Sequence, residues 1–313
     1  ELMLSGCTTV ADHHYLFPEQ LTHAIDIQVS AAQRVGTRVM LTRGSMSLGE
    51  DNGGLPPQTT VQLDDVILKD SERVIQQFHQ AVEGAMIQVA LAPCSPFSVT
   101  TELMTQTAGL AEQHNVLLHT HLAETEDENS FCLQQFGLRP VDYLESVGWL
   151  QNRTWLAHGI HFNDDEIKRL GQAGVNVGLG VDGSASNDGS NMINEVRQAL
   201  LIQRLRYPAD QVGHNDVLRW ATSGGAAVLG RSDIGRIDVG YQADLALFKL
   251  DELRFSGSHD PLAALILCGA QRADRVMVAG QWRVADGQLL GIDLPALTAN
   301  HHQAARQLVA KAL

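Results

Sequence analysis

Residues 115–124 read Asn115-Val116-Leu117-Leu118-His119-Thr120-His121-Leu122-Ala123-Glu124, an apolar run that ends in two histidines and a glutamate. Side chains two apart on a β-strand share a face, so His119 and His121 are expected to point the same way. Glu124 follows His121 by three residues, across the predicted transition from strand to loop, so its carboxylate can fold back towards that imidazole. The pattern predicts a buried strand with polar chemistry at its carboxyl end.

Further short strands are predicted on both sides of this stretch, at 8–12, 37–41, 86–91, 154–158 and 175–182. Segments of helical periodicity lie between and after them, near 18–35, 70–84, 100–114, 127–147, 163–173 and 190–206. Short strands that alternate with helices build parallel sheets from βα units. We therefore predict the α/β class, with a TIM-like (β/α)8 barrel.

The barrel is short of strands. A complete barrel takes about 250 residues, or roughly 30 per βα unit. The sequence from Glu1 resembles the second βα unit of a barrel rather than the first. The 24 positions from His158 to Asp182 hold a single strand-helix-strand step, so one unit is absent if Asp182 ends the eighth strand. We expect strands one and seven to be missing, with segments omitted before Glu1 and within about 162–175.

The predicted secondary-structure pattern changes after about residue 232. Residues 234–248 and 273–280 alternate in short strands separated by turns, which is typical of a small β-sandwich. Residues 294–313 are rich in Ala, Leu and Gln and are predicted to be helical. We predict a barrel over 1–232, and a small β-sandwich segment with a C-terminal helix over 233–313.

Composition narrows the range of partners. A net charge of −14 without a basic patch argues against a nucleic-acid polymer. No apolar run approaches the roughly 18–20 residues of a membrane helix, so no membrane partner is expected. The four cysteines are scattered, which argues against a disulfide scaffold. We predict a cytoplasmic protein with a small-molecule partner. A homo-oligomer is a further possibility, because most soluble oligomers are assembled from identical chains.

Two other predicted strands also end in polar residues. His158 closes Leu156-Ala157-His158, and Asp182 closes the run from Gly178. Each has an ordinary explanation, a buried histidine or an aspartate that caps a turn. Barrel enzymes place their active sites at the carboxyl ends of the strands, where His121 would also lie. Imidazole and carboxylate are ligands of Zn²⁺ or Fe²⁺, and a nearby free glutamate can move protons in metal-assisted hydrolysis.

These motifs resemble the amidohydrolase superfamily, in its branch of purine and triazine aminohydrolases. The family's pattern Gly-x-Ile-x-x-Gly-x-x-Ala-Asp-Leu also appears at 235–245. The resemblance implies that His121 and Asp182 bind one divalent metal, zinc first and iron second. It implies that Glu124, His158 and Asp182 are catalytic, with Glu124 as the proton shuttle. His158 and Glu124 would also contact the substrate.

Stretches 43–50, 92–98 and 181–188 are most similar to members of this branch that act on an oxidised purine. The resemblance implies hydrolytic deamination, with 8-oxoguanine giving urate and ammonia. The alternatives within the branch are guanine, an adenosine derivative and a substituted triazine.

A non-catalytic barrel scaffold is the alternative outside enzymes. The family carries a His-x-His pair at the end of strand one, and this sequence does not contain it. His13 and His14 are not expected to replace that pair, because adjacent residues of a strand face opposite sides.

Overall fold

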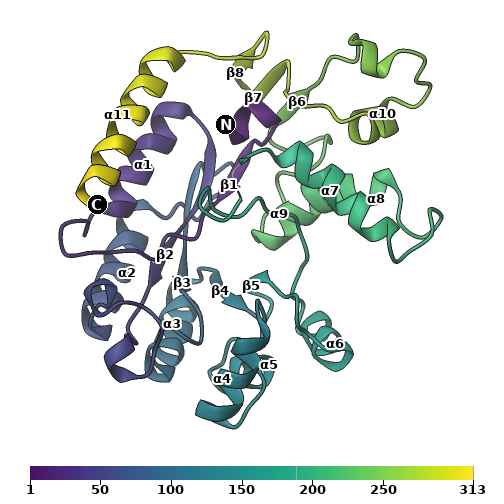
Figure 1. The fold of residues 1–313 in the computed structure, drawn as a ribbon. Helices are drawn as coiled ribbons and strands as arrows, with labels where there is room; N and C mark the ends of the chain where they lie inside the picture. Colours follow the sequence, from purple (N-terminus) through teal and green to yellow (C-terminus); the bar gives the residue numbers. More distant parts are fainter. Residues whose placement is uncertain (188, 313) are drawn as a thin grey trace. The chain divides into compact units, whose positions relative to one another are not determined.

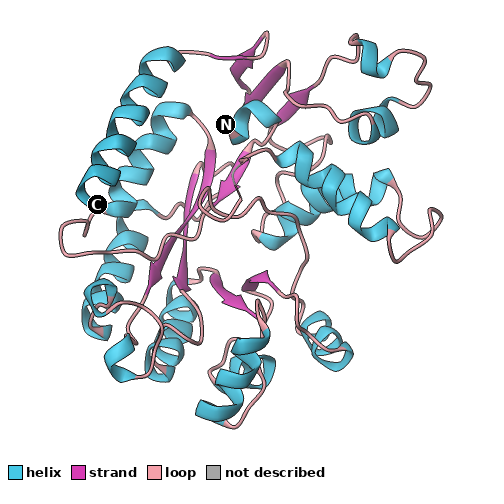
Figure 2. Ribbon diagram, viewed as in Figure 1, coloured by secondary structure: helices cyan, strands magenta, loops and turns pink. Residues whose placement is uncertain are grey.

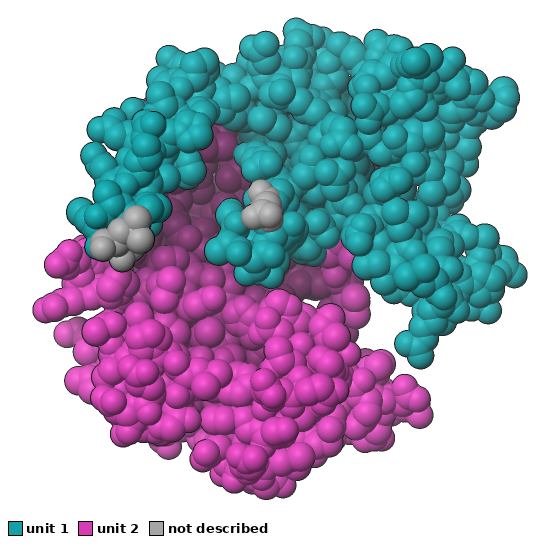
Figure 3. Space-filling view, viewed as in Figure 1, with its two compact units in different colours: residues 1–8, 180–217, 242–313 teal, residues 9–179, 218–241 magenta. Residues whose placement is uncertain are grey.

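The computed structural model describes residues 1–187 and 189–312. The chain forms two compact units (Figure 3). Unit 1 contains residues 1–8, 180–217 and 242–313, and unit 2 contains residues 9–179 and 218–241. These units do not follow the predicted boundary at 232, and the division into a barrel and a sandwich domain stays a prediction.

Unit 2 is built on a five-stranded sheet in which every pair of neighbours is parallel. The strands follow one another in chain order: β1 Thr9–Ala11, β2 Arg38–Ser45, β3 Ile87–Pro93, β4 Leu118–Leu122 and β5 Thr154–His158 (Figure 1). The helices between and after them are α1 Ala24–Val35, α2 Asp64–Phe78, α3 Thr101–His114, α4 Glu126–Phe136, α5 Pro140–Ser146 and α6 Asp164–Gln172. This succession of βα units confirms the α/β class, and it is part of the predicted barrel.

The helices bury one face against the sheet. In α2 the buried side chains Ile67, Ser71, Val74 and Ile75 recur at the spacing of one helical face. This helix packs on β3, and α1 packs on β2 (Figure 2). Short strands that alternate with helices build such a parallel sheet. That alternation is why β1–β5 could be located from the sequence.

The helix expected over 18–35 begins only at Ala24, and two further helices also differ from the prediction. The helix expected over 127–147 is divided into α4 and α5, because Gly137 ends α4 with a φ of 69° and Pro140 begins α5. The helix expected over 70–84 begins earlier, at Asp64, and ends at Phe78. None of these changes moves a strand end.

The strand expected over 175–182 is wrong. These residues form no regular element. β5 is the last strand in the order of the parallel sheet, and no strand of the described residues lies beyond it. An extended segment without a neighbour has no ladder in which to pair its backbone groups, and Gly178 and Gly180 weaken it further.

The backbone runs unbroken through 162–175. The Asn163 side chain caps α6 by accepting hydrogen bonds from the amides of Asp165 and Glu166. In return, the Asn163 amide donates to the Glu166 carboxylate at 2.8 Å. Beyond the helix, the Val175 amide donates to Leu170. Local hydrogen bonds thus connect residues 163–175, and the expectation that a segment is omitted in this window stays a prediction.

Unit 1 contains a four-stranded antiparallel sheet of order β6-β7-β8-β9. Its strands are β6 Leu245–Leu247, β7 Arg275–Val278, β8 Gln281–Ala285 and β9 Gln288–Leu289. Within 234–248, where short strands and turns were expected, the structure has one strand of three residues, β6. The C-terminal helix is confirmed as α11, Leu294–Ala312.

The remaining helical elements are shorter. They are η1 Leu2–Ser5, η2 Glu50–Asn52, η3 Gln58–Thr60, α7 Met192–Arg204, α8 His214–Arg219, the π-helical turn η4 Trp220–Gly224, α9 Gly225–Val228, η5 Leu253–Phe255 and α10 Pro261–Leu267. Along the described residues, no helix has both the length and the apolar character that a membrane span requires.

Candidate functional site

Four histidine rings form a chain of contacts, three of them at or just beyond the carboxyl ends of β1, β4 and β5 and the fourth, His119, within β4. The His13 ring stacks on His121 with 4.3 Å between centroids, and it lies 4.4 Å from the ring of His119. The rings of His121 and His158 are 5.2 Å apart. We call His13, His119, His121 and His158 the imidazole cluster. The predicted neighbourhood of His121 and His158 is therefore present.

Backbone carbonyls fix how the β4 histidines present their ring nitrogens. Nδ1 of His121 lies 2.7 Å from the Cys94 carbonyl oxygen, and Nδ1 of His119 lies 3.0 Å from that of Trp155. A carbonyl only accepts, so both Nδ1 atoms carry the proton and the lone pair of each neutral ring is on Nε2. This second hydrogen bond is the usual support of a metal-binding imidazole.

The sequence analysis considered His13 together with His14 and did not assign it to the site. Its ring joins the cluster, while the His14 ring packs on Phe17 at 5.0 Å, so the two adjacent residues do face opposite ways. Nε2 of His13 lies 3.1 Å from the Ala92 carbonyl oxygen, and its buried Nδ1 has no hydrogen-bond partner among the described residues. The available signal was a histidine directly after a predicted strand, the same signal that identified His158.

Burial keeps the innermost imidazoles neutral. It lowers the pKa of His119 to about 3, and it lowers that of His13 well below the ordinary value. Metals bind histidine in its neutral form, so the chemistry of these donors suits a divalent cation. No three His, Cys, Asp or Glu side chains converge as a metal site among the residues that the structure describes. The metal centre therefore stays a prediction.

Glu124 and His158 lie next to each other at the ends of β4 and β5. Oε1 of Glu124 is 3.7 Å from Nε2 of His158, and the Glu124 side chain is 50% exposed. The structure thus brings together three of the predicted site residues, His121, Glu124 and His158.

The backbone around this pair is strained. Ala123 has a φ of 54° and His158 a φ of 71°, in the left-handed region that side chains other than glycine's rarely adopt. Such conformations persist where the surroundings enforce them, and they cluster at functional sites.

Two backbone hydrogen bonds join the loops after β4 and β5. The Gly159 amide donates to the Leu122 carbonyl at 3.0 Å, and the His161 amide donates to the Ala123 carbonyl at 2.9 Å. We call residues 122–128 and 158–161 the β4–β5 rim. Its strained residues are therefore fixed by direct backbone contacts.

Asp182 lies in unit 1, so its approach to the other three site residues stays a prediction. It also has a left-handed backbone, with a φ of 62°. Its Oδ1 accepts from the amide of the next residue, Gly183, at 2.6 Å. The Asn187 side chain donates to the Val181 carbonyl at 2.7 Å and to Glu195 at 3.2 Å. These contacts hold the turn that carries Asp182 within unit 1.

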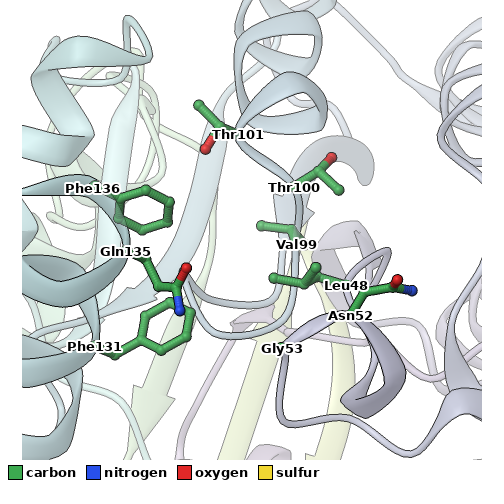
Figure 4. Close-up of a pocket in the computed structure, with 9 residues that line it drawn as sticks. All are labelled: Leu48, Asn52, Gly53, Val99, Thr100, Thr101, Phe131, Gln135 and Phe136. Carbon is green, nitrogen blue, oxygen red and sulfur yellow. The ribbon is translucent and has the colours of Figure 1, made fainter.

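A pocket of about 240 Å³ lies beneath the loop that follows β2. Phe131 and Phe136 of α4 line one side of it, and Leu48 and Val99 line the other (Figure 4). None of the predicted site residues lines this pocket.

Comparisons with known proteins give matches over most of the chain. The amidohydrolase family model matches residues 1–283. The 8-oxoguanine deaminase of Pseudomonas aeruginosa is 61% identical over 337 residues, which cover 99% of this chain and 75% of that protein. Hydroxydechloroatrazine ethylaminohydrolase of Pseudomonas sp. is 34% identical and covers 94% of this chain and 67% of its own length.

Solved structures are similar over most of the chain. Atrazine chlorohydrolase from Arthrobacter aurescens, complexed with zinc, superposes with a TM-score of 0.90 at 33% identity. The match covers 95% of this chain and 73% of that one. A triazine hydrolase variant structure superposes with a TM-score of 0.92 at 32% identity, covering 95% and 72% of the two chains.

The alignment with the Pseudomonas aeruginosa relative is longer than this chain, with 337 aligned positions against 313 residues. The relative therefore has residues, between the matched ends, that this chain lacks.

Proposed function

Because this chain belongs to the amidohydrolase family, we propose that it catalyses the metal-dependent hydrolytic deamination of an oxidised purine. The substrate that we propose is 8-oxoguanine, which would give urate and ammonia. The observation that carries this proposal is the 61% identity, over nearly the whole chain, with a relative named for that reaction.

We propose that one divalent metal takes part, held by His121 and Asp182. Zinc is favoured because a solved structure similar to this chain is described as complexed with zinc. Iron accepts the same nitrogen and oxygen donors, so metal analysis must distinguish the two. When bound, the metal supplies the Lewis acidity that makes water a nucleophile at neutral pH.

The chain's own residues would handle the protons. Glu124, with its half-exposed carboxylate, accepts a proton from the attacking water and passes it to the adjacent ring nitrogen. Glu124 then carries the proton of the new hydroxyl group to the exocyclic amine, the carbon–nitrogen bond breaks, ammonia leaves, and a carbonyl remains on the ring. His158 orients water or substrate next to Glu124, and Asp182 is proposed to orient the water.

Ammonia release from four compounds tests the proposal. The purified protein is supplied with zinc or with iron, and its metal content is measured before 8-oxoguanine, guanine, isocytosine and an aminotriazine are added separately. Turnover is expected with 8-oxoguanine. Activity on the aminotriazine alone would overturn the substrate. Absence of both bound metal and ammonia release would favour the non-catalytic scaffold.

A substituted triazine is the second candidate substrate. A named triazine-pathway relative is 34% identical, and triazine hydrolase structures superpose closely on this chain. Guanine and an adenosine derivative remain as the other ring alternatives. A small nucleobase-like partner follows from each of these reactions, whereas homo-oligomer formation and a cytoplasmic location stay predictions.

A further inference from the structure

A buried carboxylate contacts the backbone at Glu124. Glu128, in the first turn of α4, is 1% exposed. Its Oε1 accepts from the Ala123 amide at 2.7 Å, and its Oε2 accepts from the Glu124 amide at 3.3 Å. One side chain therefore holds two successive amides of the turn between β4 and α4.

Those two amides belong to the most constrained part of the β4–β5 rim. Ala123 is fully buried and has a φ of 54°, and its carbonyl is already held by the His161 amide. With Glu128 on its amide, both backbone groups of Ala123 are fixed. A strained residue keeps its conformation only where its surroundings enforce it. Here Glu128 holds the Ala123 amide, and His161 holds the Ala123 carbonyl.

The Glu124 side chain has little of its own to hold it. It is half-exposed, and the ion pair that the structure gives its carboxylate is the 3.7 Å approach to His158. Its position therefore depends mainly on the backbone from which it projects, and Glu128 fixes that backbone. We propose that Glu128 is a positioning residue that keeps Glu124 beside His158 in the rim. This inference rests on the proposed function, in which Glu124 moves the proton.

A general helix-capping role does not account for Glu128. Glu126 and Asp127 also lie in the first turn of α4, where negative charge stabilises a helix, and both are exposed. Glu128 alone of the three is buried and bonded to the strand end. Burial raises the pKa of its carboxyl, so this placement costs free energy that its two backbone hydrogen bonds must offset.

Glu128→Gln removes one of the two acceptors while it keeps the shape of the side chain. Asp127→Asn, the neighbouring exposed residue with the same change of charge, is the matched control. In ammonia-release assays we expect Glu128→Gln to lower kcat by about 10–100-fold with KM within about twofold, and the control to be unchanged. A rise of KM at constant kcat, or equal behaviour of the two variants, would overturn the proposal.

A double-mutant cycle separates positioning from a general structural effect. If Glu128 acts through Glu124, then adding Glu128→Gln to Glu124→Gln produces no further loss of kcat. A full additional loss in the double variant would contradict this route.

Amide hydrogen exchange gives a readout that does not depend on turnover. The peptide containing Ala123 and Glu124 is expected to exchange faster in Glu128→Gln and at the normal rate in Asp127→Asn. If the wild-type protein releases no ammonia, the proposed function fails while this measurement still decides the role of Glu128. Unchanged exchange in the variant would overturn the positioning role.

Glu128→Asp is the second variant if Glu128→Gln does not fold. It keeps the charge but shortens the reach by one methylene, so we expect the same selective loss of kcat and the same faster exchange. Failure of both variants to fold would assign Glu128 to general stability and overturn the proposal.

Discussion

The β4–β5 rim and the segment 175–187 both carry predicted site residues, but they differ in how the backbone is held. Backbone hydrogen bonds join the rim from Gly159 to Leu122 and from His161 to Ala123. The Glu128 carboxylate also accepts from two of its amides. Residues 175–182 form no strand, and the Asp182 carboxylate bonds to the next residue in the chain. Both began as the same kind of sequence pattern, an extended run that ends in a polar side chain.

The difference teaches that a strand-end motif acquires a position only when the strand has neighbours. β4 pairs with β3 and β5, so the residues after it emerge at a fixed place beside the residues after β5. The run before Asp182 has no such ladder among the described residues. The following predictions test this contrast, from the largest expected effect to the smallest.

Glu124→Gln is expected to lower kcat by about 10²–10⁴-fold, because it removes the proposed proton shuttle of the rim. Metal content should stay at the wild-type level, since Glu124 is not a proposed ligand. Ammonia release and metal analysis check the two parts. Glu112→Gln, the same change at an exposed residue of α3 outside the rim, is the control and should retain turnover. Undiminished activity of Glu124→Gln would reject its role.

Asp233 anchors the segment that follows α9 within unit 2. It forms two 2.7 Å bonds with Arg231 and accepts from the Gly84 amide at 2.7 Å. Arg231, with help from that amide, lowers the pKa of Asp233 to about 2 from an ordinary 3.8. A depressed carboxylate pKa stabilises the fold above the ordinary value, and this contribution disappears as pH falls from about 4 towards 2.

Asp233→Asn is therefore expected to lower the free energy of unfolding by about 2 kcal/mol at pH 7, where the native carboxylate is charged. Urea unfolding at several pH values measures this, and the deficit should shrink as the solution is acidified. Glu83→Gln, at an exposed neighbour of Gly84, serves as the control. A deficit that does not change with pH would show that the ion pair is not its source.

Two glycine substitutions compare the regions directly. Gly159, in the rim, has a φ of 69°, and an added Cβ would lie 2.7 Å from the Phe162 ring. Gly159→Ala should lower the free energy of unfolding by about 1–3 kcal/mol, because strained backbone is costly for any residue with a Cβ. Gly183→Ala has open space around it, so its effect should stay within about 0.5 kcal/mol. Equal effects in denaturant titrations would remove the contrast.

Asp182→Asn should have the smallest effect on stability, within about 0.5 kcal/mol in the metal-free protein, because the side chain is exposed and bonds locally. Metal content should nevertheless fall, since Asp182 is a proposed ligand. Thermal unfolding of metal-free protein and metal analysis measure the two quantities. Full metal occupancy in the variant would remove Asp182 from the proposed site.

The accuracy of the sequence analysis followed the range of the interactions involved. The five parallel strands were located because short β-branched runs alternate with stretches of helical periodicity, and His121, Glu124 and His158 were found because they lie at or just beyond the ends of such runs. Glu128 was not found, because its sequence position is that of an ordinary acidic residue in the first turn of a helix. Its burial depends on the turn at Ala123, which local sequence does not reveal.

By itself the sequence determined the order of βα units, the C-terminal helix and the identity of three polar residues at strand ends, because these depend on local periodicity and on where apolar runs stop. The tertiary structure alone decided that His13 stacks on His121, that Glu128 turns back to the strand end, and that 175–182 is not a strand. Each of these outcomes depends on which segments become neighbours in space. Hydrogen-bond partners and burial arise from those neighbours, and a single stretch of chain does not specify them.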